Sequence, residues 1–248
     1  MRNVTETVKQ LIIINILFFI GTLISGDVAY KFLALYFPEN HDFHAWQPIT
    51  HMFMHGGYMH IFFNMFALYS FGSALEHFWG AKKFLFFYIS CGLGAALVNT
   101  AINYYYFQEG LNVLMNHGFS KAEVLSVLNG KGSNEIVPIL NSPDFKNFIS
   151  AYMGSVVGAS GAIYGTIVAF AFMFPNAELA LMFIPVPIKA KYFVPGLVLI
   201  DLYLGVSGGE SIFGGGGIAH FAHVGGALFG FIIMWYWKKN QFNANRWN

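Results

Sequence analysis

The chain has 248 residues, of which 56% are hydrophobic and only 10% charged, and its mean hydropathy is +0.54. Because about a quarter of the residues in a soluble domain are charged, this composition excludes an ordinary soluble fold and indicates a membrane protein with several spans. The formal net charge of +1 gives no basis for binding a polyanion, so we expect no nucleic-acid partner.

Six apolar runs are long enough, or nearly so, to cross the hydrocarbon core of a lipid bilayer. They lie at about residues 10–28, 58–76, 84–103, 157–174, 192–207 and 218–237. No run shows the two-residue alternation of a membrane barrel, so the sequence predicts an all-α polytopic bundle of six transmembrane helices. We treat residues 1–248 as one membrane domain.

The lysines and arginines predict how this bundle is oriented. With six spans, both termini share one side with the loops after the second and fourth runs. Nine basic residues fall on that side: Arg2, Lys9, Lys82, Lys83, Lys189, Lys191, Lys238, Lys239 and Arg246. Four fall on the other: Lys31, Lys121, Lys131 and Lys146. The positive-inside rule therefore predicts cytoplasmic termini, and we expect a bacterial inner membrane.

The second run carries two polar side chains, His60 and Asn64. They are four residues apart, so both project from one face of a helix. The third run contains Cys91, which is the single cysteine of the chain, so no internal disulfide can form.

The third and fourth runs are joined by a long outer connection at about 104–150. Ser120 and Glu123 have the spacing of a capping box, followed by apolar residues at helical spacing, which predicts a short amphipathic helix. An earlier apolar segment ending before Gly118 is its expected partner. We interpret the connection as an outer cap that influences substrate access; the alternative is a surface decoration without effect on activity.

The fourth run opens with an uncrowded serine in the sequence VVGASGAIYG at 156–165. Ser160 is flanked by small residues, and Tyr164 follows it by four positions on the same face. The fifth run contains Asp201, a buried acid for which the sequence offers no partner. The sixth run contains His223, followed by Gly226 and Gly230.

Small residues at four-residue spacing allow helix backbones to approach closely in lipid. Gly161 and Gly165 have this spacing in the fourth run, as have the two glycines of the sixth, so we expect these runs to pack tightly. His223 could then reach Ser160, and a serine and a histidine within hydrogen-bond reach can act as nucleophile and general base.

The polar residues of runs two, four and six share a common depth. These three runs would all enter the membrane from outside, and His60, Asn64, Ser160 and His223 would lie roughly 3–10 Å below their entry points at 1.5 Å per residue. Polar groups are costly in a bilayer and usually face a cavity or a partner, so the convergence predicts a functional site.

Other interpretations of these residues remain open. A serine in a transmembrane helix commonly bonds back to its own helix, and GxxxG often means helix packing alone. His51 and His55 have metal-ligand spacing, as does a cluster of His41, His44 and His60. No carboxylate or thiolate pattern accompanies them, so we expect no metal and no cofactor.

Three segments carry a resemblance to a known family. They are WQPITHMFMHGGYMHIFFN at 46–64, GASGAIYG at 158–165 and AHVGGALFG at 222–230. In this order they are similar to the rhomboid family of intramembrane serine proteases. The resemblance implies a rhomboid-like six-helix bundle with a membrane-embedded first loop. It also implies hydrolysis of peptide bonds in or near transmembrane segments of protein substrates, by a serine and a histidine without a third carboxylate.

The resemblance assigns roles by motif position. Ser160 is the implied nucleophile and His223 the general base, because Ala222 and Gly226 fit the AHxxG pattern whereas His220 lacks the following glycine. His60 and Asn64 would line the oxyanion hole together with the backbone N–H of Ser160.

Further roles follow from the same resemblance. Tyr164 would pack against the ring of His223, and Gly158 would let the substrate carbonyl approach. Trp46 would belong to the first loop, and His55 and Glu76 would be structural. Fifth-helix residues Pro195, Gly196 and Gly205 lower helix stability beside the implied path of a laterally arriving substrate.

Two features depart from the family pattern. The first-loop pair commonly written Trp-Arg is Trp46-Gln47 here, which leaves the internal bonding of that loop open, and the connection at 104–150 is longer than the resemblance implies.

Two other classes of function compete with a protease. One is a catalytically silent relative that binds transmembrane segments, which would lack the serine or the histidine. The other is a transporter or metal-binding membrane protein, which would show paired halves with charges or broken helices at the midplane.

Overall fold

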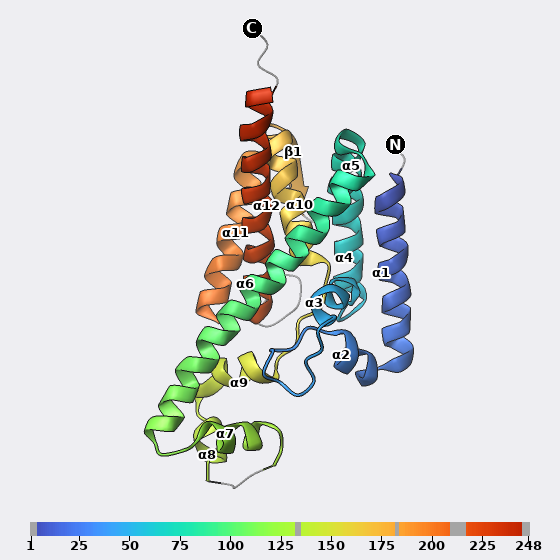
Figure 1. Ribbon diagram of the computed structural model, residues 1–248. Helices are drawn as coiled ribbons and strands as arrows, with labels where there is room; N and C mark the ends of the chain where they lie inside the picture. The colour runs from blue at the N-terminus through green and yellow to red at the C-terminus, as the bar shows by residue number, and fades with distance from the viewer. Residues whose placement is uncertain (1–3, 132–134, 182–183, 209–216, 245–248) are drawn as a thin grey trace.

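The computed structural model describes residues 4–131, 135–181, 184–208 and 217–244, and these residues are mainly helical (Figure 1). Helix is found over each of the six predicted runs. The six helical segments are α1 (Glu6–Ser25); α4 (Tyr58–Ala67), continued by the π-helical turn η2 (Leu68–Gly72) and α5 (Ser73–Trp79); α6 (Ala81–Asn116); α10 (Ser160–Met173); α11 (Ala190–Ser207); and α12 (Gly217–Ala244). Among the described residues, α1, α6 and α11 are long and apolar enough to cross a membrane, and α10 is apolar but shorter.

The smaller elements connect these helices. α2 (Asp27–Leu33), α3 (Gln47–Thr50) and the 3-10 turn η1 (His51–Phe53) lie between α1 and α4. α7 (Lys121–Leu128), α8 (Val137–Leu140), the 3-10 turn η3 (Pro143–Phe145) and α9 (Lys146–Met153) lie between α6 and α10. Strands β1 (Glu178–Leu181) and β2 (Ile184–Lys189) form an antiparallel pair between α10 and α11, with Glu178 opposite Lys189.

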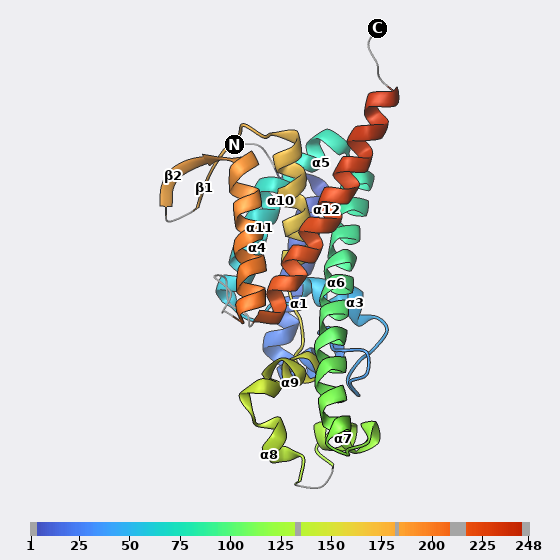
Figure 2. The ribbon, with the colours of Figure 1, turned by 90° about the vertical axis from the view of Figure 1, so that its left-hand side faces the viewer.

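The two ends of the bundle differ. The start of α1, the end of α12 and the β1–β2 pair lie at one end, and α7, α8 and α9 lie at the other (Figures 1 and 2). At the first end, the Glu76 carboxylate accepts hydrogen bonds from the N–H groups of Thr7 and Val8, both 2.9 Å, and from the Thr5 hydroxyl at 2.5 Å. The N–H groups of Thr7 and Val8 belong to the first turn of α1, where the helix itself provides no hydrogen-bond acceptor for them. Glu76 therefore joins α5 to α1, which agrees with the structural role that the resemblance implies for it.

α6, α10 and α12 pack closely around glycines. A Cβ on Gly230 would lie 2.6 Å from Cα of Gly165, and a Cβ on Gly226 would overlap the backbone of Gly161. A Cβ on Gly165 would meet the Cys91 side chain of α6. The two predicted GxxxG pairs thus face each other, and the backbones of α10 and α12 approach more closely than any side chain would allow.

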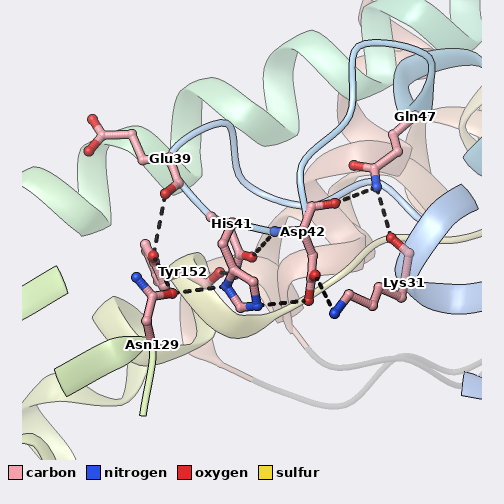
Figure 3. Close-up of polar contacts among 8 residues, drawn as sticks. Lys31, Glu39, His41, Asp42, Gln47, Asn129 and Tyr152 are labelled. Atoms are coloured by element: carbon pink, nitrogen blue, oxygen red, sulfur yellow. Dashed lines mark hydrogen bonds and ion pairs between the residues drawn. The ribbon is translucent and has the colours of Figure 1, made fainter. Parts of the chain in front are cut away.

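The first loop, between α2 and α4, is held by a glutamine. Gln47 is fully buried, and its side-chain amide donates to the carbonyl oxygens of Asp42 (2.7 Å) and Lys31 (3.2 Å) (Figure 3). Its oxygen accepts from the N–H of Tyr36 at 3.3 Å. The neighbouring Trp46 ring donates to the carbonyl of Phe32 at 2.8 Å. A neutral amide therefore bonds the loop internally at the position where the family commonly has an arginine.

The outer connection begins later than the sequence predicted. α6 continues to Asn116, thirteen residues beyond the predicted end of the third run, and it absorbs the apolar segment expected to form a separate helix. The predicted capping box is confirmed: the Ser120 hydroxyl accepts from the Glu123 N–H, and the Glu123 carboxylate accepts from the Ser120 N–H at 2.7 Å. These bonds hold the pKa of the Glu123 carboxyl below its usual value.

The connection has an apolar core of its own. Its buried residues come from α6, α7, α8 and the residue before it, η3, α9 and the first loop: Phe37, Phe107, Leu111, Leu114, Val124, Leu128, Ile136, Leu140, Phe145, Phe148 and Tyr152. We call residues 117–153 the cap. Polar contacts join the cap to the first loop: Lys121 pairs with Glu39 at 2.7 Å, and His41 contacts Asn129 at 2.9 Å (Figure 3).

Candidate active site

Ser160 is the first residue of α10. The helix starts there, three residues later than predicted, because Gly158 has a φ of +131°, which an α-helix cannot contain. The Gly158 N–H instead donates to the carbonyl of His51 at 2.9 Å. The chain before the serine is therefore non-helical and bonded to the first loop. Ser160 lies at a helix start, where the first N–H groups have no partner within the helix.

The Ser160 hydroxyl contacts a histidine from another helix. Its Oγ lies 2.8 Å from Nε2 of His223 on α12, although the two residues are 63 positions apart. His223 is only 6% exposed. The Ser160 hydroxyl therefore bonds to another helix, and the interpretation in which it bonds back to its own helix is wrong.

The imidazole of His223 is fixed on a second side by an aromatic ring. Tyr164, one turn after Ser160, stacks on it with ring centroids 4.3 Å apart and planes 9° apart. The predicted packing of these two rings is confirmed.

Asp201 on α11 supplies the contacts that the sequence did not reveal. Its Oδ2 accepts a hydrogen bond from the Tyr164 hydroxyl. Its Oδ1 contacts Nδ1 of His220 at 2.5 Å and Nδ1 of His223 at 3.3 Å. The acid, 5% exposed, thus joins α10, α11 and α12, and His220, rejected above as the base, has a partner of its own.

His60 and Gly158 adjoin the serine. A Cβ on Gly158 would lie 2.9 Å from Nε2 of His60 and 3.4 Å from Oγ of Ser160. Nδ1 of His60 accepts from the N–H of Gly56 at 3.3 Å. A neutral imidazole carries one hydrogen, so in this arrangement Nε2 of His60 is the donor, and it faces the position beside the serine.

Asn64 lies one turn further along α4. It is 6% exposed, and among the described residues its side-chain Nδ2 is a buried donor with no hydrogen-bond partner. A small hollow nearby is lined by residues that include His51, Gly158, Ser160 and His223, but neither His60 nor Asn64. The structure therefore brings Ser160, His223, Tyr164, Gly158 and His60 together, and Asn64 follows His60 by one turn of α4.

Of the histidines considered as metal ligands, His55 and His60 lie edge to face with ring centroids 5.0 Å apart, and the other three have contacts elsewhere. His51 bonds the carbonyl of Gln47 at 2.9 Å, His44 stacks on Trp46, and His41 contacts Asn129 in the cap. These contacts give them structural partners.

Within the described part of the chain, one other group has metal-ligand chemistry, and the sequence analysis did not anticipate it. It consists of Asp201, His220 and His223, whose ligand atoms lie within 4.8 Å of one another. The same atoms already bond one another. A zinc ion would require about 2.0–2.2 Å to each ligand and would replace those hydrogen bonds.

The architecture and the site define a class of protein. The chain is a mostly helical membrane protein in which a serine at the start of one helix contacts a buried histidine of another. The family model described as Rhomboid domain matches residues 42–240, and the chain belongs to the rhomboid family.

Several curated proteins are similar to the chain. A mitochondrial rhomboid protein of Schizosaccharomyces pombe, described as uncharacterized, is 29% identical over 79% of this chain and 52% of its own length. Rhomboid protein 1, mitochondrial, of Saccharomyces cerevisiae is 24% identical over 75% of this chain and 40% of its own. The mitochondrial presenilin-associated rhomboid-like protein A of Danio rerio is 25% identical over 85% and 44%.

The chain thus spans about half the length, or less, of these relatives. All three are mitochondrial by name, so they lend no support to the expected bacterial inner membrane. What holds for this chain is that it is an integral membrane protein of the rhomboid family.

Proposed function

We propose that the protein is an intramembrane serine protease that hydrolyses peptide bonds in or near transmembrane segments of other membrane proteins. The observation that carries the proposal is the 2.8 Å contact between Ser160 Oγ and the Nε2 of the buried His223, two side chains from different helices of a membrane bundle. Membership of the rhomboid family supports it.

The chemistry follows from the positions of these atoms. Ser160 Oγ attacks the peptide carbonyl carbon while Nε2 of His223 takes the hydroxyl proton, and His223 then donates that proton to the leaving amine. Water hydrolyses the resulting acyl ester in a second step that uses the same base.

The negative oxygen of the tetrahedral intermediate requires hydrogen-bond donors. The Nε2–H of His60, the unpaired Nδ2 of Asn64 and the Ser160 N–H at the start of α10 are donors of the required kind. Gly158, whose missing Cβ leaves room between His60 and Ser160, provides space for the substrate carbonyl.

The proposal includes six membrane-spanning segments: the three clearly apolar helices α1, α6 and α11, the α4–α5 segment, α10 and α12. In this arrangement the termini lie on the more positively charged side. The first loop is embedded in the outer half of the bilayer, Ser160 is near the outer face, where water can reach it, and substrates arrive laterally from the lipid.

Cleavage of a transmembrane substrate tests the proposal. The purified protein in liposomes should cut a model single-span substrate, Ser160→Ala and His223→Ala should abolish the cut, and chelators should leave it unchanged. Ser70→Ala is a matched control, because that hydroxyl bonds its own helix at the Phe66 carbonyl (2.8 Å) and should keep full activity. Continued cleavage by a folded Ser160→Ala protein would exclude the proposed mechanism.

A further inference from the structure

We propose that Asp201 is a positioning residue for catalysis. It is the third member of a Ser160–His223–Asp201 triad, in which it orients His223 and stabilises it as the base. This inference rests on the proposed function of Ser160. It differs from the arrangement that the family resemblance implies, in which a serine and a histidine act without a carboxylate.

The contacts of His223 determine which of its two ring nitrogens carries the hydrogen. A carboxylate only accepts hydrogen bonds, so the contact of Nδ1 with Asp201 Oδ1 at 3.3 Å requires the hydrogen to be on Nδ1. Nε2 then has a free lone pair directed at the Ser160 hydroxyl, 2.8 Å away. Asp201 thus selects the one neutral form of His223 that can accept the serine proton.

Two other buried side chains hold the Asp201 carboxylate in place. Tyr164 donates to Oδ2, and Nδ1 of His220 contacts Oδ1 at 2.5 Å. Tyr164 also stacks on His223, so one residue fixes both the acid and the plane of the base. All four residues, Tyr164, Asp201, His220 and His223, are buried, with at most 6% of each residue exposed. A carboxylate buried in this way is stable only with such donors, and it cannot rotate away from His223.

Asp201 also lies where it can stabilise the positive charge that forms on His223 during the reaction. When His223 takes the serine proton, it becomes a buried cation, and Asp201 Oδ1 is an anionic oxygen next to the nitrogen opposite the reacting one. The contact of 3.3 Å is longer than that to His220, and such contacts commonly shorten when the reacting complex forms. Tyr164 and His220 alone would suffice to hold three helices together, whereas the contact to His223 serves the base.

The decisive experiment compares two variants at the same carboxylate oxygen. Asp201→Asn should fold, keep KM within about threefold, and lower both kcat and the rate of Ser160 labelling by a small serine-directed probe by ~100–10,000-fold. His220→Gln removes the other, equally buried contact of Oδ1 and should lose less than about tenfold in both rates, even with a similar fall in Tm. Asp201→Glu, which restores the charge, should recover part of the rate.

Equal rate losses in Asp201→Asn and His220→Gln, or a wild-type labelling rate in folded Asp201→Asn, would overturn the proposal. A measurement on the unmodified site covers the case in which the variant does not fold. Nitrogen-15 NMR of labelled histidines, assigned with His220→Gln, should show Nδ1 of His223 protonated and Nε2 unprotonated; the opposite form would overturn it. An active Ser160→Ala protein would instead refute the proposed function, so the two failures are distinguishable.

Discussion

At the scale of single residues, the site depends on which nitrogen of each histidine carries the hydrogen. Nδ1 of His60 accepts from Gly56, so its Nε2 donates; Nδ1 of His223 faces Asp201, so its Nε2 accepts. In the proposed mechanism, two neutral imidazoles next to one serine thus have opposite functions: His60 is a donor for the oxyanion and His223 is a base for the hydroxyl.

The donor role of His60 and Asn64 predicts a graded loss of activity. Removing one oxyanion donor typically costs about 100–1,000-fold in kcat, so His60→Ala and Asn64→Ala should each fall in this range or, where the other donor substitutes, somewhat below it. Steady-state kinetics should show the loss in kcat more than in KM. If both variants turned over at the wild-type rate, neither side chain would be an oxyanion donor.

The sequence singled out Ser160, His223 and Tyr164, but it did not identify a partner for Asp201. The first three lie in short motifs whose local spacing can be read directly. The partners of Asp201 are 19, 22 and 37 positions away, so they become neighbours only when α10, α11 and α12 pack. A buried acid in an apolar run indicated that a partner existed, although it could not identify one.

At the scale of elements, the close packing of α10 and α12 holds the side chains of Ser160 and His223 in contact. Gly161 and Gly165 face Gly226 and Gly230, and the missing side chains set the separation of the two backbones. The sequence predicted this contact because GxxxG is a local pattern. It did not predict the start of α10 at Ser160, since a positive φ at Gly158 follows from the bond to the first loop.

Substituting one of these glycines should therefore impair the site. The Cβ of Gly226→Ala would overlap the backbone of Gly161, so we expect a destabilisation of about 1–3 kcal/mol and lower activity, as α12 moves His223 away from Ser160. Gly196→Ala is the matched control, because a Cβ at that position on α11 would have nothing within 4 Å of it. Thermal unfolding in detergent and probe labelling would measure both; equal behaviour of the two variants would contradict the packing argument.

At the scale of the whole molecule, the cap and the first loop form one outer assembly. The pairs Lys121–Glu39 and His41–Asn129, together with the burial of Phe37 in the cap core, link segments far apart in sequence. The sequence predicted the first helix of the cap from its capping box. It could not predict the continuation of α6 to Asn116, because the apolar spacing there fitted a separate helix equally well.

This assembly leads to a prediction about substrate access. Replacing residues 119–142 with a short Gly/Ser linker, which removes α7 and α8 and keeps α9, should leave labelling of Ser160 by a small probe nearly unchanged while altering cleavage of a transmembrane substrate. Loss of labelling in a folded protein would show that the cap helps to build the site. Unchanged cleavage across several substrates would show that it is a surface decoration.

The orientation of the bundle can be tested with cysteines. Lys131→Cys, in the cap, should react with an impermeant thiol reagent from outside sealed vesicles, and Lys82→Cys, between α5 and α6, should not. The natural Cys91 is fully buried and should react only after denaturation, so it serves as an internal control. The reverse pattern would overturn the orientation and the argument from common depth.

The central claim is that Ser160 is a nucleophile activated by His223, and the most direct measurement of it is the mass of a covalent adduct. The folded protein is incubated with a fluorophosphonate probe, digested and analysed by mass spectrometry. We predict a single adduct on Ser160, its absence in Ser160→Ala, and its near absence in His223→Ala. An unlabelled Ser160 in the folded wild-type protein, or undiminished labelling in Ser160→Ala, would contradict the claim.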